Sequence, residues 1–222
     1  MNETTVAEVR AELAALDDPK IRAVNEKHGD DHGVNLTALR AVAKRLKIQP
    51  ELARELWATE DTAARLLSIL ISRPKAFDAT ELDAMLRDSR TPKVHDWLVN
   101  YVVKKNPHVE QLRLAWFADP DPVVASAGWA LTTDRVAKKP DGLDLTALLD
   151  LIEAQMKDAP DRLQWAMNHC LAQIGIEHPD HRTRAIDIGE RLKVLEDYPT
   201  PPNCTSPFAP TWIAEMVRRK GA

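Results

Sequence analysis

The sequence predicts an all-α protein, built as an α-α superhelix of helix pairs stacked in series. Apolar residues recur at helical spacing in one segment after another, whereas no segment shows the alternating pattern of a strand. Most of the 15 prolines stand between these apolar segments, and the chain contains only 7 glycines. Short connections between helices of roughly 8–16 residues fit pairs of helices that stack along one axis.

The segment Ala118–Leu131 shows how one such repeat is expected to begin. Asp121 can cap a helix N-terminus, and Pro122 suits the first helical position. Small residues such as Gly128 then allow a neighbouring helix to pack closely. An acidic, proline-bearing turn of this kind is typical of HEAT-like repeats, and weaker copies begin at Ala58 and Lys157. Such stacks usually bind a long ligand in their concave face.

In the first half, each expected helix has a start signal. Thr5 precedes the first apolar face, and Asp17-Asp-Pro19 separates the first helix from the second. Glycines and aspartates mark 28–33 as a loop. Asn35 is a suitable cap for the third helix, and Pro50, Thr59 or Glu60, and Thr80 open the next three. The expected helices are 5–16, 20–27, 36–47, 51–58, 61–72 and 81–87.

In the second half, prolines mark most of the expected helix starts. The expected helices are 92–105, 108–117, 121–137, 145–156, 160–174, 180–193 and 211–220. The proline-rich stretch 198–210 cannot form regular structure and is expected to run extended over the last repeat. Residues 1–222 therefore read as a single HEAT-like helical-repeat domain, in which 198–222 forms an extended segment and a terminal capping helix.

The composition fits a soluble cytoplasmic protein. Hydrophobic residues make up 44% and charged residues 29%, and no segment approaches the roughly 18 apolar residues of a membrane span. The polar N-terminus does not resemble a signal peptide, and two cysteines fit a reducing compartment. The net charge of −4 is not that of an obvious nucleic-acid binder, although a local basic stripe can act on an acidic protein. We expect a monomer.

Basic residues gather on particular helices. Arg40, Lys44 and Lys47 follow one another at spacings of four and three, so they share one helix face. Lys104, Arg135 and Lys138 lie where helices end. Either the helix dipole favours these cations, or they follow the phosphates of a nucleic acid. Arg65 lies in an apolar helix, where it either extends toward solvent or faces the groove.

Two further groups of residues are candidates for catalysis or metal binding. Asp96 is expected in the first turn of its helix, where the dipole favours a carboxylate; alternatively, it stabilises positive charge developing on a sugar. His28 and His32 flank two aspartates, but no second pair of ligands has a recognised metal-binding spacing. We therefore expect solvated loop histidines, no metal site and no cofactor.

Several motifs, taken in order along the chain, resemble the DNA alkylation repair family of HEAT-like repeat glycosylases. The resemblance spans most of the chain, and the order of the motifs is more specific than any one of them. They are Gly33-Val34, Leu39–Lys44, Leu52-Ala53, Leu56-Trp57, Ala64–Leu67, the Asp96 helix, Ala127–Leu131, Asn168–Gly175 and Cys204–Ile213.

This resemblance implies a positive groove that holds double-stranded, damaged DNA, and metal-free removal of cationic N3- or N7-alkylated purines. It places the catalytic carboxylate at Asp96. The two tryptophans of the family fall on Pro92 and His169, so neither is kept, although Trp97 and His169 could supply aromatic surfaces. Together with the basic residues read from the sequence, this gives an expected DNA-binding set of Arg40, Lys44, Lys47, Arg65, Trp97, Lys104, Arg135, Lys138 and His169.

Two hypotheses follow. The first is a repair N-glycosylase in which Asp96 stabilises an oxocarbenium-like sugar. The second is a non-catalytic helical-repeat module that binds DNA structures or a protein partner. The loss of both tryptophans favours the second hypothesis, and the retained carboxylate supports the first.

Overall fold

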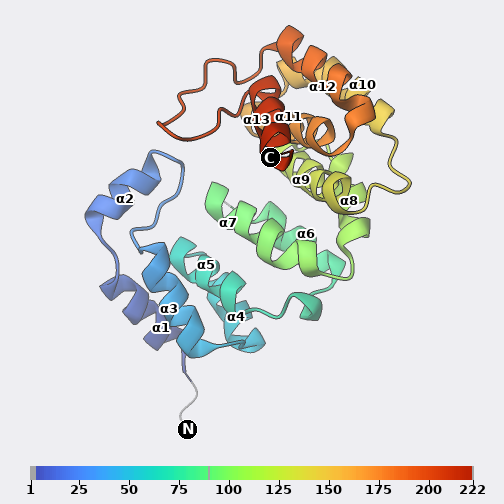
Figure 1. The fold of residues 1–222 in the computed structure, drawn as a ribbon. Helices are drawn as coiled ribbons and strands as arrows, with labels where there is room; N and C mark the ends of the chain where they lie inside the picture. The colour runs from blue at the N-terminus through green and yellow to red at the C-terminus, as the bar shows by residue number, and fades with distance from the viewer. Residues whose placement is uncertain (1–3, 90, 222) are drawn as a thin grey trace. The chain divides into compact units, whose positions relative to one another are not determined.

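The structure, a computed structural model, describes residues 4–89 and 91–221. Within these ranges it contains α-helices, short 3-10 and π turns and no strand (Figure 1). An isolated bridge joins Asp17 and Val34. The all-α prediction is therefore confirmed. Among the described helices, none is long and apolar enough to cross a membrane.

The chain divides into two compact units, Met1–Glu110 and Gln111–Ala222. The expectation of one domain stays a prediction. The helices of the first unit are α1 (Val6–Ala15), α2 (Pro19–Glu26), α3 (Leu36–Leu46), α4 (Pro50–Ala58), α5 (Thr62–Ile71), α6 (Ala79–Arg87) and α7 (Pro92–Trp97).

Helix α5 forms the centre of the first unit. Its residues from Thr62 to Ile69 are all buried, and it packs against α1, α3, α4 and α7. Burial all around a helix is expected where neighbours cover every face. Asn35 caps α3 as predicted, whereas the caps of α5 and α6 are Asp61 and Asp78 rather than the threonines and glutamate proposed from the sequence. An aspartate accepts the free N–H groups of a first turn with a full charge, which explains this choice.

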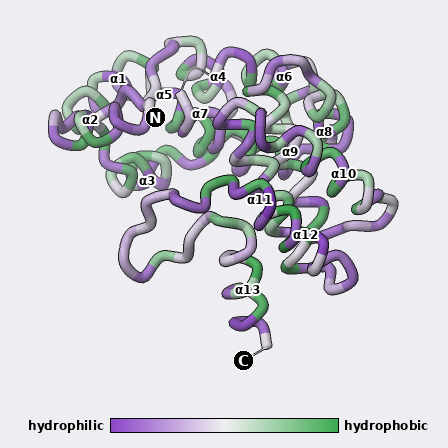
Figure 2. Tube along the Cα trace, turned by 90° about the horizontal axis from the view of Figure 1, so that it is seen from above, coloured by the Kyte–Doolittle hydropathy of each residue, from purple (hydrophilic) through white to green (hydrophobic). Residues whose placement is uncertain are grey.

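The remaining helices are α8 (Val109–Phe117), α9 (Pro122–Lys138), α10 (Leu145–Gln155), α11 (Asp161–Glu177), α12 (Pro179–Leu192) and α13 (Ala209–Lys220). In the second unit α11 packs against α9, α10, α12 and α13. Hydrophilic and hydrophobic residues alternate along α12 and α13 (Figure 2). One face of each helix therefore covers the core, while the other meets solvent.

The expected start of α9 is confirmed. The Asp121 carboxylate accepts a hydrogen bond from Val123 N at 2.8 Å, and Pro122 is the first helical residue. Gly128 permits the close approach anticipated from the sequence, because a Cβ there would lie 2.3 Å from the backbone nitrogen of Phe117. Backbone, rather than a movable side chain, fills this space.

We predict that Gly128→Ala destabilises the protein by about 3 kcal/mol, because an added methyl group must displace the end of α8. Urea unfolding of the two proteins measures the difference. Gly221→Ala is the control, since a Cβ there meets its nearest heavy atom at an ordinary 3.7 Å. Equal stability of Gly128→Ala and the wild type would show that the two helices do not pack this closely.

Candidate nucleic-acid interface

Asp96 lies near the end of α7 with its carboxylate toward solvent. Its side chain is 60% exposed, and His95 Nδ1 lies 3.3 Å from one carboxylate oxygen. The predicted place in the first turn is wrong: Pro92 is the first residue of α7, so Asp96 is in the second turn. The helix dipole acts mainly within the first turn. The helix dipole therefore accounts less well for a carboxylate at this position than the sequence suggested.

The backbone after Asp96 departs from the regular helix expected over 92–105. A π turn occupies Leu98–Val102, and a 3-10 turn follows over Val103–Lys105. The sequence carries no Gly or Pro in this stretch that would have signalled the change. Wide turns of this type occur frequently at functional sites.

Four side chains form a continuous row that includes Trp97, the residue after Asp96. We call it the cation–aromatic row: Arg40, Trp97, Tyr101 and Lys105. The guanidinium carbon of Arg40 lies 5.2 Å from the centre of the Trp97 ring. The Trp97 and Tyr101 rings meet edge to face at 5.2 Å, and Lys105 Nζ lies 5.7 Å from the Tyr101 ring. The row thus places a cation at each end of two aromatic rings.

Sequence reasoning named Arg40 and Trp97 but missed Tyr101 as a site residue. The spacing of four between Trp97, Tyr101 and Lys105 is the signal that could have found the row. On α3, Lys44 is exposed one turn beyond Arg40, and Lys47 follows the helix end with a φ of 61°. Within the described residues, Arg40, Lys44 and Lys47 make no ion pair with a carboxylate, whereas the neighbouring Arg45 pairs with Glu12.

A buried polar cluster fixes the start of α7. The Asp30 carboxylate accepts a hydrogen bond from the backbone nitrogen of Lys93 at 2.9 Å and lies 3.3 Å from Lys93 Nζ. Thr91, at the N-cap position, makes no capping hydrogen bond with its side chain. Asp30 therefore does the capping from the loop between α2 and α3, and it is almost fully buried.

His32 belongs to the same cluster, so the prediction of a solvated loop histidine is wrong for this residue. It is only 2% exposed, and its Nε2 faces two donors, Asn25 Nδ2 at 3.4 Å and Lys93 Nζ at 3.5 Å. Nε2 must accept in this setting, which requires the neutral ring. Burial, and then the charge of Lys93, lower the pKa of His32 below 6.5. Among the described residues, no three metal-binding side chains come together.

The structure places Arg65 differently from both alternatives that the sequence offered, a groove-facing arginine and one that extends toward solvent. It is 2% exposed, its Nε donates to Trp57 O at 3.2 Å, and its guanidinium pairs with the Asp88 carboxylate. The guanidinium also lies over the Trp57 ring, 4.9 Å from its centre. These interactions engage the charge inside the protein, so Arg65 neither faces a groove nor extends into solvent.

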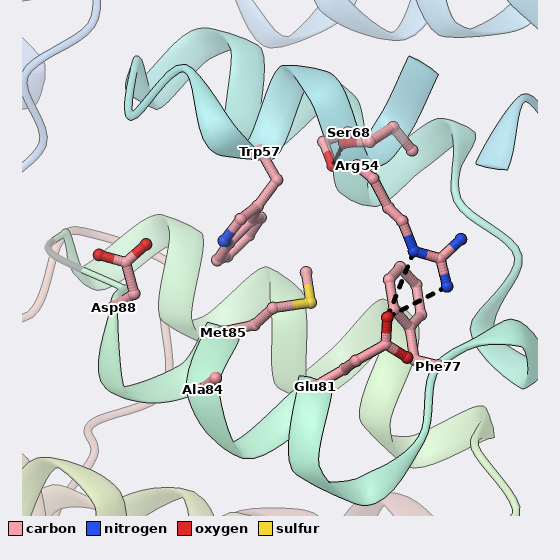
Figure 3. Close-up of a pocket in the computed structure, with 9 residues that line it drawn as sticks. Arg54, Trp57, Ser68, Phe77, Glu81, Ala84, Met85 and Asp88 are labelled. Atoms are coloured by element: carbon pink, nitrogen blue, oxygen red, sulfur yellow. Dashed lines mark hydrogen bonds and ion pairs between the residues drawn. The ribbon is translucent and has the colours of Figure 1, made fainter. Parts of the chain in front are cut away.

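Trp57 borders a cavity of about 380 Å³ between α4, α5 and α6 (Figure 3). Met85 lies in the middle of its wall, the Arg54–Glu81 ion pair at 3.2 Å stands at one end, and Asp88 stands at the other. Because each cation near this cavity already faces a carboxylate, the cavity offers no surplus positive charge to a phosphate.

The other predicted DNA-binding residues belong mostly to the second unit. Arg135 donates to the carbonyl oxygen of Asp141 at 2.9 Å, and Lys138 pairs with Asp134 at 2.8 Å. The exposed ring of His169 stacks on Trp212, with ring centres 5.0 Å apart. In the first unit, Lys104 is half-buried in the 3-10 turn. Binding of DNA by these residues stays a prediction.

Comparison with known proteins agrees with this architecture. A family model described as DNA alkylation repair enzyme matches residues 9–213, so the chain belongs to this family. A solved structure is similar over 98% of this chain and 95% of its own, with a TM-score of 0.78 and 22% identity. That protein is related to the HEAT-like repeat DNA glycosylases and has affinity for branched DNA structures. The likeness confirms the predicted HEAT-like fold. No curated protein matches the chain significantly.

The environment of His32 predicts a pH dependence. The pKa of His32 is lower in the folded chain than the ordinary 6.5. As the pH falls, the unfolded state therefore binds a proton at this histidine before the native state does. The free energy of unfolding should therefore fall as the pH is lowered from about 7 to about 5. Urea unfolding across this range measures the effect.

His32→Gln removes the titrating group and should flatten this part of the profile, even if it lowers stability at neutral pH. His28→Gln, in the same loop but exposed, should keep the wild-type slope. Identical slopes for wild type and His32→Gln would mean that another group causes the dependence.

Proposed function

We propose that this protein binds double-stranded DNA, damaged or branched, through the surface formed by the cation–aromatic row and the exposed cations of α3. The observation that carries the proposal is the row itself, in which two aromatic rings lie between Arg40 and Lys105, on a segment that also carries the exposed Asp96 carboxylate. Membership of the DNA alkylation repair family supports it. So does the affinity for branched DNA of the structurally similar protein.

Each component of this surface suits a different part of DNA. The cations can neutralise phosphates and release their counterions, which supplies affinity without regard to sequence. The Trp97 and Tyr101 rings can pack on a sugar or on a base that has left its stack. Because the net charge of the chain is −4, binding must come from this local surface and should depend strongly on salt.

We predict that Lys44→Glu weakens DNA binding roughly tenfold and makes the logarithmic salt dependence shallower by about 0.9 for each phosphate that is no longer neutralised. Fluorescence anisotropy with blunt duplex, forked and N7-methylated DNA over a range of salt measures both quantities. Lys20→Glu is the control, since it makes the same charge change on α2, outside the row. If Lys44→Glu keeps the wild-type salt slope, this face does not meet phosphate.

A second candidate function is excision of alkylated purines, and the exposure of Asp96 beside Trp97 favours it. An N3- or N7-alkylated purine is already cationic, so it departs as a neutral base when its glycosidic bond breaks and the purine nitrogen takes the electron pair. The sugar becomes oxocarbenium-like, and a nearby carboxylate stabilises that positive charge. Water then adds to the sugar carbon and loses a proton.

We predict that Asp96→Asn abolishes any release of 7-methylguanine while DNA binding is kept within about twofold, because the amide keeps the shape and loses the charge. Base release from N7-methylated DNA in single-turnover conditions tests this. Wild-type release by Asp96→Asn would remove this carboxylate from the mechanism. If the wild type binds DNA but releases no base, only the first function, DNA binding, remains supported.

A further inference from the structure

The second unit holds an aromatic cleft distinct from the cation–aromatic row. The proline-rich segment 193–208, which we call the strap, runs from the end of α12 to the start of α13 (Figure 1). Between the strap and the outer faces of α11 and α13 lies a cavity of about 260 Å³. Three aromatic residues line it: Trp165 from α11, Tyr198 from the strap and Trp212 from α13.

These rings are unusually open to solvent for their size. Trp165 is 37% exposed and Tyr198 is 47% exposed, and they meet edge to face with ring centres 5.1 Å apart. Trp212 is held in turn by a nearly parallel stack with His169, at an interplanar angle of 18°. Grouped large apolar side chains left exposed indicate a binding surface more often than an isolated one does.

The strap fixes the walls of the cleft before any ligand arrives. Asn168, buried within α11, donates from Nδ2 to the carbonyl oxygen of Pro207 at 2.8 Å. Cys204 N donates to Pro201 O at 3.1 Å and closes a turn. Prolines restrict the chain further, so little conformational entropy would be lost on binding.

An arginine lies at the rim. Arg219 Nη2 lies 3.4 Å from the hydroxyl oxygen of Thr205, a residue that lines the cleft. Arg218 and Arg219 share a single carboxylate, Glu215, whose pKa they hold at about 2. Two guanidinium groups against one ionised carboxylate leave one positive charge beside an aromatic cavity.

We infer that this cleft binds an unpaired nucleobase, with the adjoining phosphate at Arg219. The inference rests on the proposed DNA binding and names a part of DNA that a fully paired duplex lacks. Every base has a face that can stack on an aromatic ring, so such a cleft would accept bases without regard to sequence. The volume lies below the roughly 300–1,000 Å³ of pockets for drug-sized ligands, as expected for one planar base.

Proline-rich peptides also bind aromatic grooves. In this cleft, however, Pro201 and Pro207 of the strap already form part of the lining. The rim cation further favours a phosphate-bearing ligand over a neutral peptide.

Cys204 provides a reporter inside the cleft, because it is exposed and lines the cavity. Cys170 is buried, and burial raises the pKa of its thiol to about 12, so N-ethylmaleimide should modify Cys204 alone in the folded protein. We expect a short single-stranded oligothymidine to slow this modification several-fold, measured by mass spectrometry. A blunt duplex at the same nucleotide concentration should protect Cys204 far less.

Trp165→Ala and Tyr198→Ala should each weaken protection by oligothymidine roughly tenfold, because each removes a stacking surface. Both side chains are partly exposed, so the variants should keep the wild-type melting temperature. Leu151→Ala, which removes another exposed apolar side chain of the second unit, is the matched control and should leave protection unchanged.

Two results would overturn the inference: equal modification of Cys204 with and without oligothymidine, or wild-type protection in both aromatic variants. A proline-rich peptide that protects Cys204 where oligothymidine does not would also overturn it. If Lys44→Glu no longer binds duplex DNA but oligothymidine still protects its Cys204, the cleft binds independently of the row. Duplex binding by the wild type without protection of Cys204 would support the proposed function and reject the cleft.

Discussion

The candidate interface depends on one buried interaction, the capping of α7 by Asp30. This carboxylate reaches a helix N-terminus 63 residues further along the chain and also faces the Lys93 ammonium. A buried ion pair is stable only when its remaining hydrogen-bonding groups are satisfied, and here Asn25 accepts from Lys93 Nζ at 3.1 Å. The cluster thereby holds the helix that carries Asp96 and Trp97, although none of its members belongs to the row.

The distribution of ion pairs divides the basic side chains of this acidic protein into two groups. Many of its basic side chains are neutralised within the fold: Arg45 by Glu12, Arg65 by Asp88 and Arg184 by Asp150. Paired cations of this kind have little capacity left for phosphate. Arg40 and Lys44 of α3 differ, since within the described residues they meet an aromatic ring or solvent instead of a carboxylate. Local pairing, rather than the net charge of −4, therefore decides which cations keep their charge available at the surface.

Aromatic side chains occur in two arrangements with different chemistry. In the first unit, Trp97 and Tyr101 lie between two cations, which suits a charged backbone with a sugar or base beside it. In the second unit, the rings of Trp165, Tyr198 and Trp212 enclose a cavity, which suits a single planar group. Neither surface contains the tryptophan that the family resemblance places at Pro92.

The sequence by itself determined the helical class, the repeat architecture, the order of the helices and the caps at Asn35 and Asp121, because these depend on local periodicity and on hydrogen bonds to nearby residues. It also named Arg40, Trp97 and Asp96 as candidate site residues. Only the tertiary structure decided that Arg65 is buried against Asp88, that Asp30 caps α7, and that a π turn follows Trp97. These features arise from interactions between residues far apart in the chain, or from packing that overrides local helix propensity, and no local pattern encodes them.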